Sequence, residues 1–123
     1  MRAMEKKVAH QPEGCSKHLL AIRDTLELLS GKWKIQIIST LLMTDKLRFM
    51  DLIRSVDGIG AKMLSKELQE LEINQLVKRK VCDTKPITVE YEITEYGKTL
   101  EKVIFEMSAW GTMHRKRLFE TVD

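Results

Sequence analysis

The apolar residues of this 123-residue chain recur at helical spacing over most of its length. The spacing i, i+3, i+4, i+7 is that of one face of an α-helix that packs on a core. It predicts four successive helices, at residues 19–29, 33–42, 49–56 and 61–74. The second is apolar around most of its circumference, which predicts a central position in the core. Ser30 is placed to cap this second helix, and a turn is expected at 44–46.

The period of the pattern changes after residue 76. Residues 77–83 and 88–93 predict two strands, and in the second strand apolar and polar residues alternate. Lys85 lies at the tip of the hairpin that these strands form. Thr94 is then placed to cap a long final helix, with Glu95 near its positive end.

This order of elements predicts a mainly α fold with a small β-hairpin (α+β). The third and fourth helices, joined by a turn that contains Gly58 and Gly60, are typical of a helix-turn-helix. A hairpin directly after the second of them is the wing of a winged helix-turn-helix. We expect residues 1–14, which are polar, to form a flexible arm and residues 15–123 to form a single domain with a long C-terminal helix.

Composition narrows the functional classes. The chain has 21 basic and 18 acidic residues, a net charge of +3 and a pI near 8.9, so its total charge does not decide whether it binds nucleic acid. Two cysteines make no disulfide framework, which favours reduced thiols and a cytoplasmic location. No apolar run is as long as a membrane span, and the N-terminus lacks the pattern of a signal peptide, so we expect no membrane partner.

Polar side chains that can contact DNA share one face of the fourth predicted helix, opposite its leucines. They are Lys62, Ser65, Lys66 and Gln69, at i, i+3, i+4 and i+7. Lysine can contact phosphate or guanine, and glutamine can pair with adenine. Ala61 lies at the positive end of the same helix, where a phosphate is favoured. The face predicts a recognition helix, although an ordinary solvated helix face has the same composition.

Basic residues near this helix favour the DNA-binding interpretation. Residues 31–85 hold 11 basic and 7 acidic residues, a larger excess than that of the whole chain. The expected additional DNA contacts are Lys46, Arg48, Arg79 and Lys85. From the hairpin tip, Lys85 can reach the phosphates beside the groove or enter the minor groove.

Several short motifs, in order along the chain, carry a family resemblance. They are Cys15, the run Leu26-Glu-Leu-Leu-Ser-Gly-Lys-Trp-Lys34, Arg48-Phe49, Lys62-Met63-Leu64, Val89-Glu90-Tyr91, Thr94-Glu95-Tyr96-Gly97 and Trp110-Gly111. Over roughly 15–114 the chain resembles the HxlR-type winged helix-turn-helix regulators, which are MarR-like. The resemblance implies a cytoplasmic bacterial transcription regulator that binds a pseudo-palindromic operator as a homodimer, with an unknown inducer. Ser16, Gly60 and Thr88 depart from the family pattern, and the change at Thr88 shifts the contact of the wing with phosphate towards Lys85.

The final helix carries two apolar stripes. One contains Leu100, Val103, Ile104, Met107, Trp110, His114 and Leu118, and the other contains Phe105, Ala109 and Met113. One stripe can cover the home domain, which leaves the other for a partner. We expect a homodimer, because symmetric dimers are the commonest oligomers. Its expected interface residues are Leu19, Ile22, Phe105, Ala109, Trp110 and Met113. The alternative is a C-terminal helix with one part-exposed side.

Cys15 precedes the first apolar stripe and is close to Lys17 and His18. A helix N-terminus and nearby cations lower the pKa of a thiol, which makes it reactive towards oxidants and electrophiles. Several HxlR-type regulators sense through this cysteine, so the resemblance favours a sensor, while a structural role for Cys15 stays open. In a dimer, Cys15 could also pair with a cysteine of the other subunit, either its own counterpart or Cys82, which is the only alternative. Cys15 and His18 have zinc-like spacing, but a structural zinc site needs four ligands, so we expect neither metal nor cofactor.

The sequence holds no pattern that supports enzymatic chemistry. Gly58-x-Gly60 is too short for a phosphate-binding loop and follows no strand. No Ser/His/Asp set or carboxylate pair occurs in a suitable context. The prediction is therefore a sequence-specific, DNA-binding transcription regulator. The alternatives are a winged-helix module that binds only proteins and an architectural protein that binds DNA without sequence preference.

Overall fold

The computed structural model describes the backbone of residues 13–122 and the side chains of residues 16–120. The chain divides into two compact units, one ending at Gly31 and the other beginning at Lys32. Helix α2 (Glu13–Leu28) belongs to the first unit and begins inside the segment predicted as an arm. The rest of that segment, residues 1–12, lies outside the described residues. Leu19 and Ile22 are exposed on α2.

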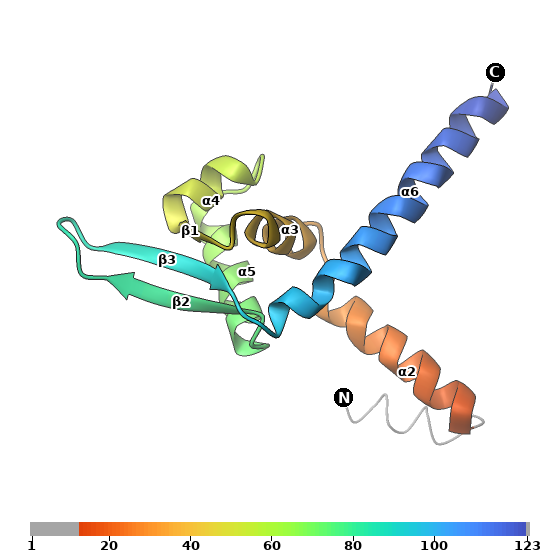
Figure 1. Cartoon of the computed structure of the whole chain (residues 1–123), viewed down its shortest axis with the longest axis horizontal. Coiled ribbons are helices and arrows are strands. Elements are labelled where there is room, and N and C mark those ends of the chain that lie inside the picture. The colour runs from red at the N-terminus through yellow and green to blue at the C-terminus, as the bar shows by residue number, and fades with distance from the viewer. Residues whose placement is uncertain (1–12, 123) are drawn as a thin grey trace. The chain divides into compact units, whose positions relative to one another are not determined.

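The second unit contains the remaining elements, in nearly the predicted order (Figure 1). They are α3 (Lys34–Thr44), β1 (Lys46–Arg48), α4 (Phe49–Ser55), α5 (Ala61–Ile73), β2 (Val77–Cys82), β3 (Thr88–Ile93), the 3₁₀ helix η1 (Gly97–Leu100) and α6 (Glu101–Val122). The prediction that Ser30 caps the second helix is wrong. The N-cap of α3 is Trp33, without a side-chain hydrogen bond, because the chain turns through Gly31 at φ +82° before the helix starts.

The three strands form an antiparallel sheet in the order β1-β3-β2. Strand β1 was not predicted, because three residues are too few to establish a period of two. It pairs with the far edge of β3, with Lys46 opposite Glu92 and Arg48 opposite Glu90. The predicted hairpin is confirmed, and Val77 and Cys82 of β2 pair with Ile93 and Thr88 of β3.

Helix α3 lies at the centre of the core, as its apolar circumference predicts. Ile37, Ile38 and Leu41 of α3 are completely buried. They share the core with fully buried leucines of α4 and α5, which are Leu52, Leu64, Leu68 and Leu71. Each such side chain contributes about 1.5–3 kcal/mol through burial. The core therefore fixes which face of α5 turns inward and which turns to solvent.

Thr94 and Gly97 join the hairpin to the final helix. The Thr94 hydroxyl accepts a hydrogen bond from the Gly97 N–H at 2.8 Å, as the predicted cap requires, although the first turn is the 3₁₀ helix η1. Gly97 is buried against the base of the hairpin. A Cβ atom there would collide with the Leu76 carbonyl oxygen and with the Ile93 side chain. Only glycine fits at this close approach.

Helix α6 extends away from the other elements of the second unit (Figure 1). Ile104 is half-buried, but the large apolar side chains that follow it on α6 are exposed. They are Phe105, Met107, Trp110, Met113, Leu118 and Phe119. The expectation that one stripe of this helix covers its own domain is wrong beyond Ile104, because the helix leaves the core after its first turn. None of the described helices is long and apolar enough to cross a membrane.

Candidate nucleic-acid interface

The turn between α4 and α5 gives the two helices their helix-turn-helix connection. Gly58 adopts φ +87°, which side chains disfavour, and Ile59 is buried next to it. Gly60 is the N-cap of α5 and offers no side-chain cap. The first backbone N–H groups of α5 have no acceptor within the helix, and this end of the helix attracts anions.

The predicted row of polar residues forms one exposed surface of α5. Lys62, Ser65, Lys66 and Gln69 are exposed, while the leucines on the opposite side are completely buried. Ala61 is also exposed, at the first residue of the helix. Neither Lys62 nor Lys66 forms an ion pair with any residue that the structure describes. We call Lys62, Ser65, Lys66 and Gln69 the recognition row.

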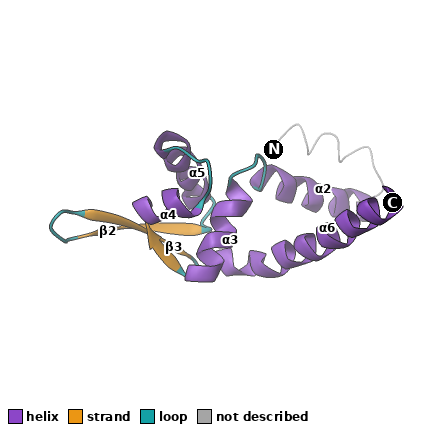
Figure 2. Cartoon of the chain, turned by 90° about the horizontal axis from the view of Figure 1, so that it is seen from above, coloured by secondary structure: helices purple, strands orange, loops and turns teal. Residues whose placement is uncertain are grey.

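A hollow of about 570 Å³ connects the recognition row to the hairpin. Ser65 lines it from α5, Arg48 from the end of β1 and Arg79 from β2. Phe49 and Tyr91, whose ring centroids are 6.3 Å apart, also line it. The fold thus brings two predicted basic residues together with the recognition row. Figure 2 shows α5, α4 and the hairpin at the end of the second unit opposite to the free end of α6.

The basic residues of the sheet are partly neutralised by two glutamates. Glu92 lies between Lys46 and Lys78 in the strand register, and Glu90 lies between Arg48 and Lys80. The ammonium of Lys78 is 3.6 Å from a carboxylate oxygen of Glu92. Lys85, exposed at the hairpin tip, forms no ion pair with a described residue. Charge counting along the sequence did not detect this cross-strand pairing.

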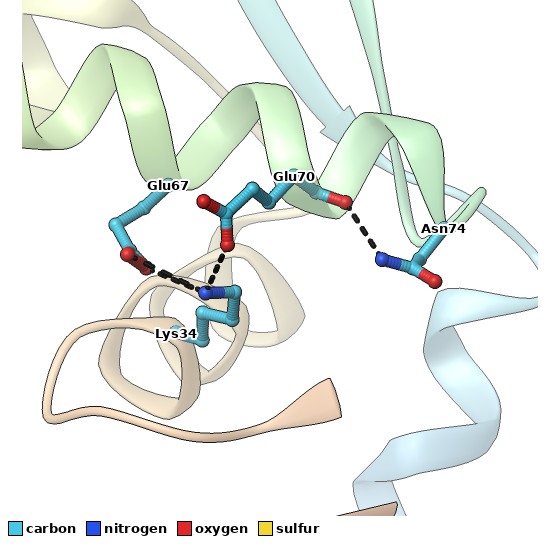
Figure 3. A network of polar contacts seen from close by, with 4 residues as sticks. All are labelled: Lys34, Glu67, Glu70 and Asn74. Carbon is cyan, nitrogen blue, oxygen red and sulfur yellow. Dashed lines mark hydrogen bonds and ion pairs between the residues drawn. The ribbon is translucent and has the colours of Figure 1, made fainter. Parts of the chain in front are cut away.

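A buried ion cluster joins α5 to α3 (Figure 3). The Lys34 ammonium is 2.9 Å from Glu67 Oε2 and 2.6 Å from Glu70 Oε1. The side chains of Lys34 and Glu67 are only 8% and 10% exposed, whereas that of Glu70 is 42% exposed. Glu67 faces α3, because it lies three residues after Leu64 and four before Leu71, which are both completely buried.

The cluster shifts the pKa of Lys34 and of Glu70. Burial lowers the pKa of Lys34, but the hydrogen bonds and attractions from Glu70 and Glu67 outweigh burial and raise that pKa above its ordinary value. The hydrogen bond from Lys34 lowers the pKa of Glu70, and the charge of Lys66 adds a smaller effect in the same direction. Lys34 and Glu70 are therefore both charged at neutral pH. The sequence offered one signal, a lysine placed between apolar residues of a core helix.

The remaining predicted residues lie elsewhere in the chain. Leu19 and Ile22 are exposed on α2, and Phe105, Ala109, Trp110 and Met113 are exposed on α6. Cys15 falls in the first turn of α2, and its side chain is outside the described part of the structure. Cys82 is a half-buried free thiol. Among the described residues, no group of three or more potential metal ligands occurs.

A helix-turn-helix followed by a hairpin wing defines a DNA-binding transcription regulator of the winged helix-turn-helix class. The chain belongs to the HxlR-like helix-turn-helix family, whose sequence model matches residues 28–119. It is 38% identical over 103 residues to the uncharacterized HTH-type transcriptional regulator YtcD of Bacillus subtilis, covering 84% of this chain and 81% of the relative. The family and its relatives are transcriptional regulators and not enzymes, in agreement with the sequence prediction.

Two solved structures of redox-related regulators are similar to this chain. The redox regulator HypR in its reduced form has a TM-score of 0.74 and 35% identity, covering 81% of this chain and 98% of HypR. The reduced form of the transcriptional regulator YodB from B. subtilis has a TM-score of 0.66 and 37% identity, covering 73% of this chain and 87% of YodB. HypR has also been solved in an oxidized form, and YodB after treatment with diamide.

The ion cluster makes a prediction about stability. Lys34→Met leaves the Glu67 carboxylate buried without its partner, and we expect it to lower the free energy of unfolding by about 3–5 kcal/mol. Lys34→Met/Glu67→Met replaces both charges by apolar groups of similar length and is expected to recover most of that loss. Urea unfolding followed by circular dichroism measures both variants. Equal destabilisation by the single and the double variant would contradict the prediction.

Proposed function

We propose that this protein is a homodimeric, sequence-specific regulator that binds a pseudo-palindromic operator in the cytoplasm. Each protomer inserts α5 into the major groove of one half-site. The observation that carries the proposal is the exposed recognition row, whose two lysines form no ion pair with a described residue and lie on the face opposite the buried leucines. A recognition helix presents side chains of this kind to base edges and phosphates.

The residues around α5 have separate roles in this proposal. Gln69 and Lys62 contact base edges, and Ser65 and Lys66 contact bases or the adjacent phosphates. Arg48 and Arg79 bind phosphates from the border of the hollow, and Lys46 adds positive charge at its strand edge. Backbone N–H groups at Ala61 receive a phosphate at the helix N-terminus. Lys85 reaches the backbone or the minor groove beside the recognition helix.

The second copy of the chain covers the exposed apolar residues of α6 and α2 in this proposal. Phe105, Trp110 and Met113 are 68%, 59% and 60% exposed. Gly111 is at the middle of α6, where an antiparallel second α6 could approach closely. An interface of this kind fits the symmetry of a pseudo-palindromic operator.

Operator binding tests whether the recognition row and Lys85 contact DNA. We expect the protein to bind the DNA that flanks its own gene, and Gln69→Ala to weaken this specific binding by about 1–3 kcal/mol through loss of a base contact. Lys85→Ala should weaken binding to all sequences about equally and reduce the salt dependence by about one unit of log–log slope. Fluorescence anisotropy with labelled duplexes, over a range of salt concentrations, measures both effects.

Lys98→Ala is the charge control for these variants, because it removes an exposed lysine outside α5 that pairs with Asp45 and Glu95. If Lys62→Ala and Lys66→Ala both retain full operator affinity, α5 does not enter the major groove. A steep salt dependence without sequence preference indicates an architectural DNA-binding protein. Absence of any DNA binding indicates a module that binds only proteins.

Charged substitutions on α6 test the dimer. We expect Phe105→Glu and Met113→Glu to convert a dimer into a monomer in analytical ultracentrifugation, because each places a charge in an apolar interface. Operator affinity should fall together with dimer content, since each protomer reads one half-site. Met43→Glu, at another highly exposed methionine but on α3, is the control and should remain dimeric. A monomeric wild-type protein with full operator affinity would rule out this assembly.

Cys15 is proposed as the redox-sensitive group, with support from the redox regulator HypR and the diamide-treated YodB among the similar structures. Diamide oxidises Cys15 and a second thiol to a disulfide and is itself reduced to the hydrazine. We expect this to change operator affinity about fivefold or more in the wild type, the usual range for a coupling between sites. Cys15→Ser should not respond, whereas the control Cys82→Ser should respond like the wild type.

Fluorescence anisotropy before and after treatment with diamide separates the outcomes. Loss of the response in both cysteine variants indicates that the disulfide joins Cys15 to Cys82. An unchanged response in Cys15→Ser, or no response in the wild type, means that Cys15 has a structural role.

A further inference from the structure

Glu70 lies between two lysines that have different environments. Its Oε1 atom is 2.6 Å from the ammonium of Lys34, which belongs to α3 and is almost completely buried. Lys66 precedes Glu70 by one helical turn and belongs to the recognition row. Figure 3 shows the carboxylates of Glu67 and Glu70 both directed at Lys34. Lys66 contributes to the lowered pKa of Glu70 but forms no ion pair with a described residue.

Without Lys34, Lys66 would be the cation that still acts on Glu70. Side chains at i and i+4 are neighbours on a helix surface, and a lysine and a glutamate at this spacing attract each other. A lysine that pairs with a carboxylate is less available to a phosphate. The buried Lys34 attracts Glu70 more strongly than the exposed Lys66 can, because the hydrogen bond is short and less screened by water.

Glu67 fixes Lys34 beside Glu70, where Lys34 competes with Lys66 for the Glu70 carboxylate. Its two carboxylate oxygens lie 2.9 and 3.4 Å from the Lys34 ammonium, and its side chain is buried on the inner face of α5. The ammonium is therefore fixed beside α5 at the level of Glu70. Two of the three acidic residues of α5 are thus occupied on the side of the helix that faces α3.

We propose that Lys34 is a positioning residue for DNA recognition, which holds Glu70 against α3 and so leaves Lys66 free to bind a DNA phosphate. The proposal rests on the proposed function, because it assumes that the recognition row contacts DNA. It concerns where the charge of Glu70 lies and not how much charge the protein carries. Replacing Lys34 and Glu67 by neutral residues together leaves the net charge unchanged.

A cycle of four proteins isolates this effect. They are the wild type, Glu70→Gln, Lys34→Met/Glu67→Met and Lys34→Met/Glu67→Met/Glu70→Gln. The double variant removes the buried pair without leaving an unpaired buried charge. Urea unfolding checks that all four are folded. Fluorescence anisotropy with the operator duplex, from low to moderate salt, gives the affinity and the salt slope of each protein.

We expect the double variant to bind operator about two- to fivefold more weakly per recognition helix, with a salt slope smaller by up to about one. The upper limits correspond to complete loss of one phosphate contact at about 0.15 M salt. Adding Glu70→Gln to the double variant should restore both values. In the wild-type background Glu70→Gln should change them little, because Lys34 already holds that carboxylate. Glu95→Gln, which removes an exposed acidic group outside α5, is the matched charge control and should have no effect.

Equal effects of Glu70→Gln in the two backgrounds would overturn the proposal, since a pure change of net charge acts alike in both. Failure of Glu70→Gln to restore the double variant would also overturn it and would leave Lys34 with a structural role only. Lys66→Ala distinguishes these results from failure of the proposed function. If Lys66→Ala leaves the wild-type salt slope unchanged, α5 does not bind DNA through Lys66.

An NMR titration of Glu70 without DNA provides a second readout. The pKa of Glu70 should rise towards the ordinary value in the double variant.

Discussion

The ammonium of Lys34 places the strongest single constraint on this fold. A buried charge is tolerated only when its partners are fixed around it, and here both partners come from one helix, α5. Core packing between leucines determines which face of α5 turns inward, but apolar contacts alone tolerate sliding along the helix axis. An ion pair with defined atoms does not. The exposed face of α5 is therefore specified in rotation by the core and in axial position by Lys34.

The same arrangement separates the charges of α5 by sign. Acidic side chains at Glu67 and Glu70 are directed towards α3, and basic side chains at Lys62 and Lys66 are directed to solvent. In the sheet the charges are arranged differently, because glutamates of β3 lie opposite basic residues of β1 and β2. Basic side chains without an ion pair to a described residue are thus found on α5, at Lys62 and Lys66, and at the hairpin tip, at Lys85. A protein with a net charge of only +3 can in this way present a locally basic surface.

Periodic segments of the sequence predicted most of the second unit. The leucines of α5 and the alternation in β3 placed these elements within a residue or two, and the recognition row followed from the same periodicity. Features that depend on contacts between distant residues were not predictable. Strand β1 exists because β3 offers it an edge, and the burial of Glu67 depends on a lysine 33 positions earlier in the chain. The exposure of α6 depends on the direction in which the chain leaves the sheet, which no local pattern contains.

Gly97 determines that direction, because the backbone there lies against the base of the hairpin with no room for a side chain. Helix α6 has 22 residues and so acts as a lever about 33 Å long. A tilt of roughly 10° at its base displaces its far end by about 6 Å, close to the height of two base pairs. An alanine at position 97 would displace only a few atoms locally. Helix α6 would turn that small change in direction into a much larger displacement at its far end.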